Sequence, residues 1–232
     1  MLEMKHIKAF TFDTGGTILD WHSGFKNGFK YIKNKYKLEI NCEKLANIFR
    51  HKSLEIVTSQ NQDNLINFDT AHKLAIEELI KEYKLNISKD DIEYLYYKIP
   101  SKLLPWNDFL ETFNLIKKKY LCVSFTLLSN RLVYLNSKQN NINWDLILSC
   151  ETLEVYKPNI KAYIKTANLL QLKPSECVMV ACHSFDLNAA KKAGFNTIFV
   201  KREKEWGSET TISVDGNYDL VISNFNELNK LI

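Results

Sequence analysis

The chain lacks the segments that mark a membrane or secreted protein. None of its apolar runs approaches the roughly 20 residues that span a bilayer. Residues 1–12 contain no apolar core of a signal peptide and run directly into a strand pattern. The five cysteines form no Cys-x-x-Cys pair and show no regular spacing, which is typical of buried, reduced thiols. We therefore expect a cytoplasmic protein that does not act at a membrane.

A block of one charge sign is also missing. The net charge is +4, from 31 Lys and Arg against 27 Asp and Glu, and the lysines are scattered along helical patterns. The run Lys117-Lys118-Lys119 is short and precedes a strand pattern, so it indicates a solvated helix end and no nucleic-acid partner. We find no internal repeat, linker or low-complexity segment. At 45% hydrophobic and 25% charged residues, the composition is ordinary for a globular enzyme.

The period of the apolar residues changes twice along the chain. Residues 6–12 form a short strand pattern that ends at Asp13 and is followed by the Gly15-Gly16 turn. From Ser23 to Ile99 the patterns are helical, at 25–32, 45–56, 71–83 and 87–97. After Pro100 and Pro105, strand patterns at 122–128, 146–149, 177–181, 197–200 and 220–222 alternate with helical ones, notably 160–170 and 187–193.

This order predicts an α/β fold with a doubly wound, Rossmann-like parallel sheet core and an inserted helical cap domain. We assign residues 1–21 and 105–232 to the core and residues 22–104 to the cap. In such sheets the ligand site lies beyond the carboxyl ends of the strands. Polar residues at or near those ends are the first candidates for a functional site: Asp13, Ser129, Asn130, Lys157, His183 and Asp186.

Four motifs occur in an order that carries a family resemblance. The segment Phe12–Asp20, with Asp13 followed by Gly16-Thr17-Ile18, resembles the nucleophile loop of the haloacid dehalogenase superfamily. The superfamily's later landmarks follow as Ser129 at a strand end, the pair Lys157-Pro158 and the acidic segment 181–187. A finer resemblance is to the type II branch, the metal-independent (S)-2-haloacid dehalogenases, in residues 20–21, 49–55, 104–108, 144–145 and 194–207.

The magnesium ligands of the superfamily's phosphatases are incomplete here. The resemblance implies that those enzymes hold Mg²⁺ with the nucleophile, a second Asp two positions later and a third in the last motif. In this chain Gly15 and Ala181-Cys182 stand at two of those places. Because Mg²⁺ requires hard oxygen ligands, we expect no metal and no cofactor.

A carboxylate nucleophile without a metal suits attack on a carbon–halogen bond. The resemblance implies that Asp13 displaces halide from C2 of a short (S)-2-haloacid and forms an ester. Water then releases the (R)-2-hydroxy acid. Lys157 would keep Asp13 ionised, although a lysine in a loop can also be a solvated surface residue. The substrate and water are the expected partners, together with a second copy of the chain in a homodimer, which only the resemblance suggests.

Six further residues have both a functional and a structural interpretation. Thr17 and Ser129 can hydrogen-bond Asp13 or the substrate carboxylate, or act as ordinary capping residues. Asn130 can donate to the substrate carboxylate or cap the next helix. The resemblance implies that Arg50 receives the halide and that Tyr163 lines the pocket, but they can equally be a solvated helix arginine and a packed helix aromatic. Asp186 either activates the hydrolytic water or caps the following helix.

The motifs depart from the type II pattern at two places. Gly15 stands where characterised relatives often carry an aromatic wall of the halide pocket, so the pocket is larger or differently lined. His183 replaces a frequent Asn, as a water-positioning group or as a structural hydrogen-bonding residue. We take Cys182 as a buried thiol. The sequence leaves open two other functions: a Mg²⁺-dependent phosphatase of a small metabolite, and a non-enzymatic protein that binds a carboxylate or a protein partner.

Overall fold

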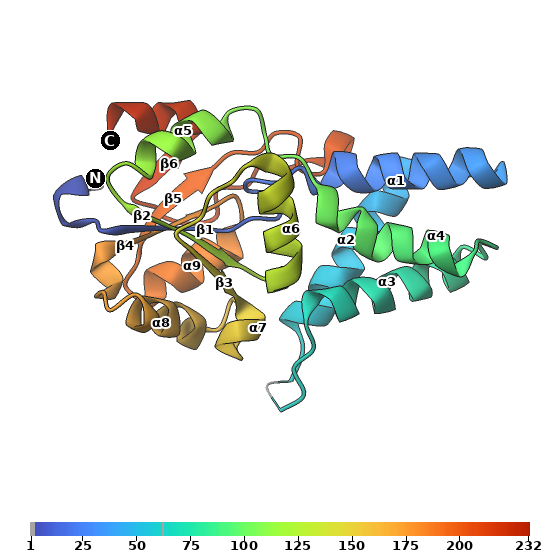
Figure 1. Cartoon of the computed structure of the whole chain (residues 1–232), viewed down its shortest axis with the longest axis horizontal. Helices are drawn as coiled ribbons and strands as arrows, with labels where there is room; N and C mark the ends of the chain where they lie inside the picture. Colours follow the sequence, from blue (N-terminus) through green and yellow to red (C-terminus); the bar gives the residue numbers. More distant parts are fainter. Residues whose placement is uncertain (1–2, 62) are drawn as a thin grey trace.

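A six-stranded, fully parallel sheet forms the centre of the molecule in the computed structural model, which describes residues 3–61 and 63–232 (Figure 1). The strand order is β3-β2-β1-β4-β5-β6. The strands are β1 (Ala9–Phe12), β2 (Leu121–Thr126), β3 (Leu146–Ser149), β4 (Cys177–Ala181), β5 (Asn196–Val200) and β6 (Leu220–Ile222). The prediction of a doubly wound, Rossmann-like parallel core is confirmed.

The first strand is central because the chain turns to opposite sides of it. From β1 the chain builds β2 and β3 on one side, then returns and builds β4, β5 and β6 on the other. This switch point lies between β1 and β4, where Phe12 is in register with Val180. Ligands of such sheets bind in the crevice at the switch point. The residues after Phe12 and after Ala181 therefore lie where a site is expected.

Aromatic residues fix the helices to the two faces of the sheet. Phe12 of β1 packs against Phe109 and Phe113, with ring centroids 6.1 and 5.9 Å away. On the other face, Phe125 of β2 meets Tyr163 edge-on at 5.2 Å. Figure 1 shows α5 and the last helical turn on one side of the sheet and α8 and α9 on the other. Burial of these rings is the main favourable term that holds the layers together.

The remaining core elements are short. The helices are α5 (Phe109–Ile116), α6 (Asn130–Asn140), α7 (Cys150–Leu153), α8 (Ile160–Leu169) and α9 (Ser184–Lys192). Short 3₁₀ helices of three residues occur at Met4–His6, Pro174–Glu176 and Gly207–Glu209 and, in the cap, at Pro100–Lys102, and a longer one of six residues occurs at Phe225–Lys230. The first strand is therefore shorter than the predicted 6–12, because a 3₁₀ turn closed by Ile7 N–H on the Met4 carbonyl takes up its beginning.

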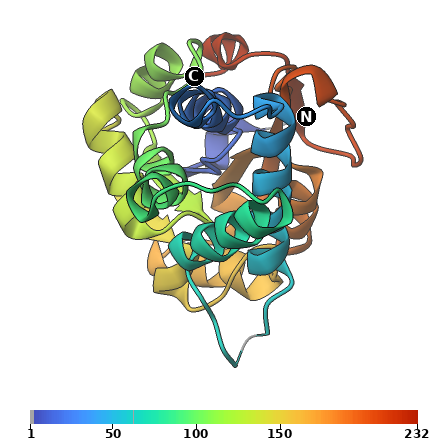
Figure 2. The same cartoon turned by 90° about the vertical axis from the view of Figure 1, so that its right-hand side faces the viewer.

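Four helices form a separate layer beyond the ends of the strands (Figures 1 and 2). They are α1 (Trp21–Tyr36), α2 (Cys42–Thr58), α3 (Phe68–Glu82) and α4 (Lys89–Glu93), which continues as a π-helical turn, Tyr94–Lys98. Each of the four is preceded by a capping residue whose side chain accepts a backbone N–H: Asp20, Asn41, Asn67 and Ser88. The third helix thus begins before the Asp69-Thr70 pair that marked it in the sequence.

The chain passes between the two layers twice, side by side. Leu19 and Pro105 pair in an antiparallel bridge. Next to it, Asp20 N–H donates to the Leu104 carbonyl and Trp106 N–H to the Ile18 carbonyl, each at 2.8 Å. We propose that the domain boundaries lie here, at 21/22 and 104/105. The inserted helical cap that the sequence predicts is present as a layer of the fold.

Two further expectations concern the chain as a whole. Among the residues described, no helix is both long and apolar enough to cross a membrane. All five cysteines are free thiols, but only Cys122, Cys150 and Cys177 are buried. Cys182, expected to be buried, is partly exposed because it lines a groove at the surface.

Candidate active site

Asp13 lies immediately after the central strand, at the switch point. Its backbone N–H continues the sheet by donating to the Val180 carbonyl at 3.0 Å. The carboxylate is 6% exposed, so the surrounding side chains decide its charge and its reactivity. Its Oδ1 atom faces Lys157 and its Oδ2 atom faces Thr17 and His183.

Lys157 lies between two carboxylates. Its Nζ is 3.2 Å from Asp13 Oδ1 and 2.6 Å from Asp186 Oδ2, and its side chain is completely buried. It also lies 4.7 Å from the centre of the Phe125 ring, a cation–π distance. Tyr163 fixes Asp186 from behind by donating its hydroxyl proton to Oδ1 at 2.6 Å. The fold therefore brings residues that are up to 173 positions apart in the chain into one buried network.

The two carboxylates have opposite pKa shifts. Burial raises the pKa of Asp13, but Lys157, His183 and Thr17 outweigh it, so the pKa lies well below the usual range. For Asp186, burial and the charge of Asp13 outweigh Lys157, and the pKa is raised. Burial lowers the pKa of Lys157, yet the two carboxylates raise it overall. Asp13 is thus the firmly ionised carboxylate, and Asp186 is the more basic one.

Two donors hold the Oδ2 atom of Asp13. Thr17 donates its hydroxyl proton to it at 2.8 Å, and His183 Nδ1 lies 3.1 Å away. The proton of Thr17 has a defined direction, because Thr17 Oγ1 accepts the backbone N–H of Cys182 at 3.0 Å. Oδ2 is therefore the more strongly hydrogen-bonded oxygen, whereas Oδ1 contacts only the lysine among the described residues.

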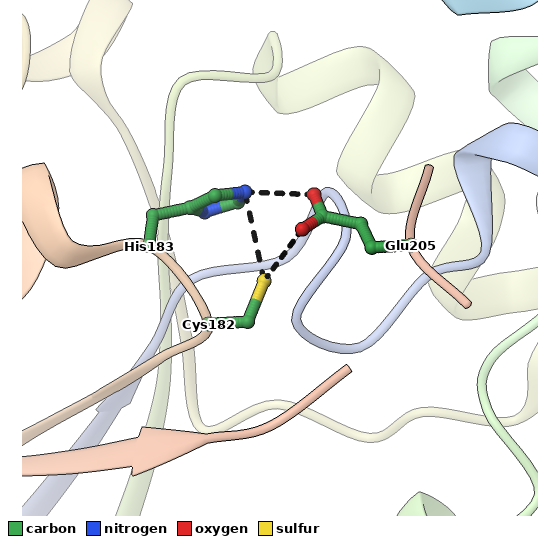
Figure 3. A group of neighbouring side chains, drawn as sticks. All are labelled: Cys182, His183 and Glu205. Carbon is green, nitrogen blue, oxygen red and sulfur yellow. Dashed lines mark hydrogen bonds and ion pairs between the residues drawn. The ribbon is translucent and has the colours of Figure 1, made fainter. Parts of the chain in front are cut away.

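His183 bridges Asp13 to a third carboxylate, Glu205. Its Nε2 atom lies 2.8 Å from Glu205 Oε1 (Figure 3). This oxygen also accepts the indole N–H of Trp21 at 3.1 Å. Carboxylates at both nitrogens call for a proton on each nitrogen. Burial lowers the pKa of an imidazole, but Cys182, Glu205 and the hydrogen bond to Asp13 raise the pKa of His183 well above its usual value. His183 is therefore a charged, double donor.

Arg50 reaches the site from the cap. Its guanidinium carbon lies 5.4 and 5.6 Å above the rings of Trp21 and Phe68, and the residue is 4% exposed. Nη2 makes one long hydrogen bond, 3.4 Å, to the Gly15 carbonyl. Within residues 3–61 and 63–232, Nε has no partner. A buried guanidinium with an unused donor is a strong site for an anion.

Among the described residues, Ser129 and Asn130 make their hydrogen bonds with residues other than Asp13. Ser129 caps α6 by accepting the Leu132 N–H at 3.1 Å. The Asn130 amide donates to Glu151 Oε1 at 2.9 Å and to Thr152 Oγ1 at 2.5 Å, so its donors point to α7. Asp186 is not a helix cap, contrary to the alternative drawn from the sequence, because α9 begins at Ser184 and His183 holds the cap position.

The Arg50 guanidinium lies against Gly15, in the space that a side chain at this position would fill. A Cβ atom on Gly15 would lie 3.0 Å from Arg50 Nη2. The backbone there needs no left-handed conformation, so the close approach of the guanidinium is the feature that favours a residue without a side chain. The place that a larger residue would occupy is thus taken by the cation.

The residues present do not fit a magnesium ion. The ammonium group of Lys157 already occupies the space between Asp13 and Asp186. Gly15 offers no carboxylate, and its carbonyl accepts from Arg50. Magnesium needs about six hard oxygen ligands in octahedral geometry, and these positive groups take the oxygens that would supply them.

Three residues of this network were missed from the sequence as site residues. Glu205 lies in an irregular segment five residues after β5, and Trp21 begins the first cap helix. Phe125 reads as an ordinary strand residue. For Trp21 and Glu205, the only indication in the sequence was the resemblance of their segments to the type II branch. Neither periodicity nor a motif predicts the contact between these two residues, which are 184 positions apart.

A capped α/β fold with a buried, lysine-paired aspartate at the switch point defines a class of hydrolases. A family model described as haloacid dehalogenase-like hydrolase matches residues 10–200, and the chain belongs to this family. It is 25% identical over 203 residues to (S)-2-haloacid dehalogenase 4A of Burkholderia cepacia, covering 85% of this chain and 84% of the relative.

Solved structures agree with this assignment. The defluorinating L-2-haloacid dehalogenase Rha0230 superposes with a TM-score of 0.89 at 25% identity, over 97% of this chain and 94% of that one. The L-2-haloacid dehalogenase PA0810 has a TM-score of 0.88 at 24% identity, over 97% and 99% of the two chains. The resemblance to the type II branch is confirmed.

Proposed function

We propose that the protein hydrolyses short (S)-2-haloacids to (R)-2-hydroxy acids, without a metal, through an ester on Asp13. The observation that carries this proposal is the placement of a buried, incompletely paired Arg50 beside an ionised, lysine-paired Asp13. The relatives whose names state (S)-2-haloacid dehalogenase activity support the substrate class. Hydrolysis of a carbon–halogen bond is the reaction that these features have in common.

The Oδ1 atom of Asp13 is the attacking oxygen. Oδ2 is held by the hydroxyl of Thr17 and the imidazolium of His183, which reduce its nucleophilicity. Oδ1 faces only the lysine at 3.2 Å among the described residues and keeps a free lone pair. It forms a bond to C2 as the C2–halogen bond breaks, and the halide leaves with the bonding electron pair. Attack from the opposite side inverts C2.

Arg50 receives the negative charge of the substrate. The guanidinium lies against the nucleophile loop at Gly15, and its unused donors can bind the departing halide or the substrate carboxylate. Burial lowers the pKa of Arg50, with Glu205 and Asp13 acting against this, and an incoming anion would remove part of the desolvation cost. The cation therefore binds most strongly when a charge develops on the leaving group.

Asp186 and the two donors on Oδ2 serve the second half of the reaction. Water attacks the Asp13 Cγ atom, and Asp186, the more basic carboxylate, takes the proton. Oδ2 is then the carbonyl oxygen of the ester, so Thr17 and His183 stabilise the oxyanion that forms there. The Cγ–Oδ1 bond breaks, Oδ1 takes the proton of the added hydroxyl group and leaves as the product hydroxyl, and Asp13 returns as a carboxylate. Asp186 then releases its proton to solvent.

The remaining candidates have supporting roles. Tyr163 fixes the orientation of Asp186, and Gly15 leaves room for the guanidinium. We assign the substrate carboxylate to Ser129 and Asn130 at the end of β2, which for Asn130 requires the amide to leave Glu151. The homodimer expected from the family stays a prediction. Phosphatase activity is disfavoured, because Lys157 fills the space between the carboxylates that a metal would require.

The decisive experiment measures halide release in EDTA. Purified protein is incubated with (S)-2-chloropropionate and separately with chloroacetate. A folded Asp13→Asn variant is measured in parallel. Release that persists in EDTA and vanishes in the variant is the expected result. No release from either substrate by the folded protein would contradict the proposal, and a phosphatase screen with magnesium would follow.

A further inference from the structure

Three different ligand atoms meet on the wall of a surface groove, next to the proposed nucleophile. They are Cys182 Sγ, His183 Nε2 and a carboxylate oxygen of Glu205, all within 4.8 Å of one another (Figure 3). We infer that these residues form a binding site for a divalent cation of the zinc class. The donor set, its spacing, its surroundings and its access each support this site.

The spacing of the three atoms fits a tetrahedral ion. Cys182 Sγ lies 3.5 Å from His183 Nε2 and 3.5 Å from Glu205 Oε2. A zinc ion bonds sulfur at about 2.3 Å and nitrogen at about 2.0 Å, and tetrahedral geometry then separates the two ligands by about 3.5 Å. The contact between His183 and Glu205 is made by the other carboxylate oxygen, Oε1, and is closer at 2.8 Å, because a proton now joins the two atoms. A small rotation of the carboxylate would open that pair.

The second nitrogen of His183 is already oriented as in a metal site. Nδ1 lies 3.1 Å from Asp13 Oδ2, so Nδ1–H donates to a carboxylate and Nε2 is the nitrogen left for the metal. Metal-bound histidines usually donate their other N–H to a carboxylate or a carbonyl, which fixes the ring. Trp21 holds Glu205 in the same way, through its indole N–H on Oε1 at 3.1 Å.

The local charge can accept a divalent ion without a net change. Acidic and basic side chains are matched in number around the site: Asp13, Asp186 and Glu205 lie beside Lys157, His183 and Arg50. Binding removes one proton from His183 Nε2 and one from the Cys182 thiol. The two charges that the ion brings replace these two protons, so the balance is kept.

A groove of about 250 Å³ gives access to the site, and its wall includes Cys182, His183 and Glu205. Three protein ligands leave a fourth tetrahedral position, which this groove can fill with water. A thiolate, an imidazole and one carboxylate together favour zinc or cobalt over magnesium or calcium, which prefer oxygen ligands alone.

The test is a titration of the metal-free protein with Zn²⁺ by calorimetry and with Co²⁺ by absorption. We expect one equivalent to bind with micromolar or tighter affinity, and thiolate-to-cobalt charge-transfer absorption to develop in the near ultraviolet. Calorimetry in buffers of different ionisation enthalpy should show release of protons at neutral pH. The matched control is Cys42→Ser, which removes the other partly exposed thiol, in the cap, and should bind as the wild type does.

Cys182→Ser should abolish the cobalt absorption and weaken zinc binding at least about tenfold, and Glu205→Gln should also weaken it. Circular dichroism and the melting temperature establish whether each variant is folded. If Cys182→Ser is not folded, zinc binding to Glu205→Gln tests the site. Absence of saturable binding to the wild type would overturn the site. Binding that is unchanged in both folded variants would overturn it equally.

Discussion

The ammonium group of Lys157 lies closer to Asp186, at 2.6 Å, than to the proposed nucleophile Asp13, at 3.2 Å. One cation thus serves two carboxylates whose pKa values are shifted in opposite directions. Because the environments differ, the same residue type can supply a nucleophile and a base in one reaction. The two halves of the proposed reaction should therefore be separable by mutation.

Asp186→Asn should stop the reaction after its first half. Asp13 keeps Lys157, Thr17 and His183, so halide is still displaced, but no carboxylate takes the proton of the hydrolytic water. We expect a burst of about one halide per protein and turnover slowed about 100-fold or more. Rapid-quench halide measurement and the mass of the trapped ester check this. Asp13→Asn is the control without a burst, and steady turnover at the wild-type rate in Asp186→Asn would exclude Asp186 as the base.

Thr17→Val should slow hydrolysis of the ester more than its formation. The substitution keeps the shape of the side chain and removes the donor to Asp13 Oδ2. Loss of one oxyanion donor typically costs about 100- to 1000-fold in rate. Thr17→Ser keeps the hydroxyl and is the matched control, and single-turnover kinetics separate the two steps. Equal slowing of ester formation and ester hydrolysis would mean that Thr17 only positions Asp13.

Gly15→Ala should weaken substrate binding without a large loss of stability. The new Cβ would lie 3.0 Å from Arg50 Nη2, so the guanidinium has to move by a few tenths of an ångström. We expect KM for the haloacid to rise by about tenfold or less. The melting temperature should change little, because the backbone at this position is not left-handed. An unchanged KM would mean that Arg50 does not bind the substrate in the position found here.

The sequence predicted the parts of the fold that repeat with a period. Strand patterns at 146–149, 177–181 and 220–222 coincide with β3, β4 and β6, since fully buried parallel strands are short apolar runs. The ion pair between Asp13 and Lys157 was anticipated from the order of the motifs. The strands follow from the apolar pattern along the chain, and the ion pair follows from the order of the family's motifs.

Contacts that depend on irregular segments could not be predicted in this way. Glu205 reaches His183 from a loop without periodicity, and the direction of its side chain depends on the Trp21 indole across 184 positions. The Asn130 amide turns to Glu151 because α7 presents an acceptor there, which no local pattern indicates. The role of Gly15 could likewise not be predicted, because it depends on the Arg50 guanidinium that lies next to it.

Asp91 provides a prediction about the stability of the cap that is independent of the active site. This buried carboxylate lies in the first turn of α4, where it accepts from Lys35 Nζ at 2.8 Å, from Tyr36 at 2.5 Å and from Ser88 at 2.7 Å. Burial raises its pKa, but these three donors outweigh burial and lower it overall. Asp91→Asn should therefore reduce the free energy of unfolding by about 1–3 kcal/mol at neutral pH.

The sign of the pH dependence follows from the lowered pKa. A carboxylate that is more acidic in the folded state stabilises the fold fully above its unfolded pKa of about 3.9, and this contribution is lost as the pH falls through the folded value. The difference between wild type and Asp91→Asn, from urea unfolding at several pH values, should be constant near neutrality and shrink below about pH 4. Asp90→Asn, at the exposed neighbouring position of the same helix, is the control and should change little. A difference that grows as the pH falls would show that Asp91 is not held as an ionised acceptor.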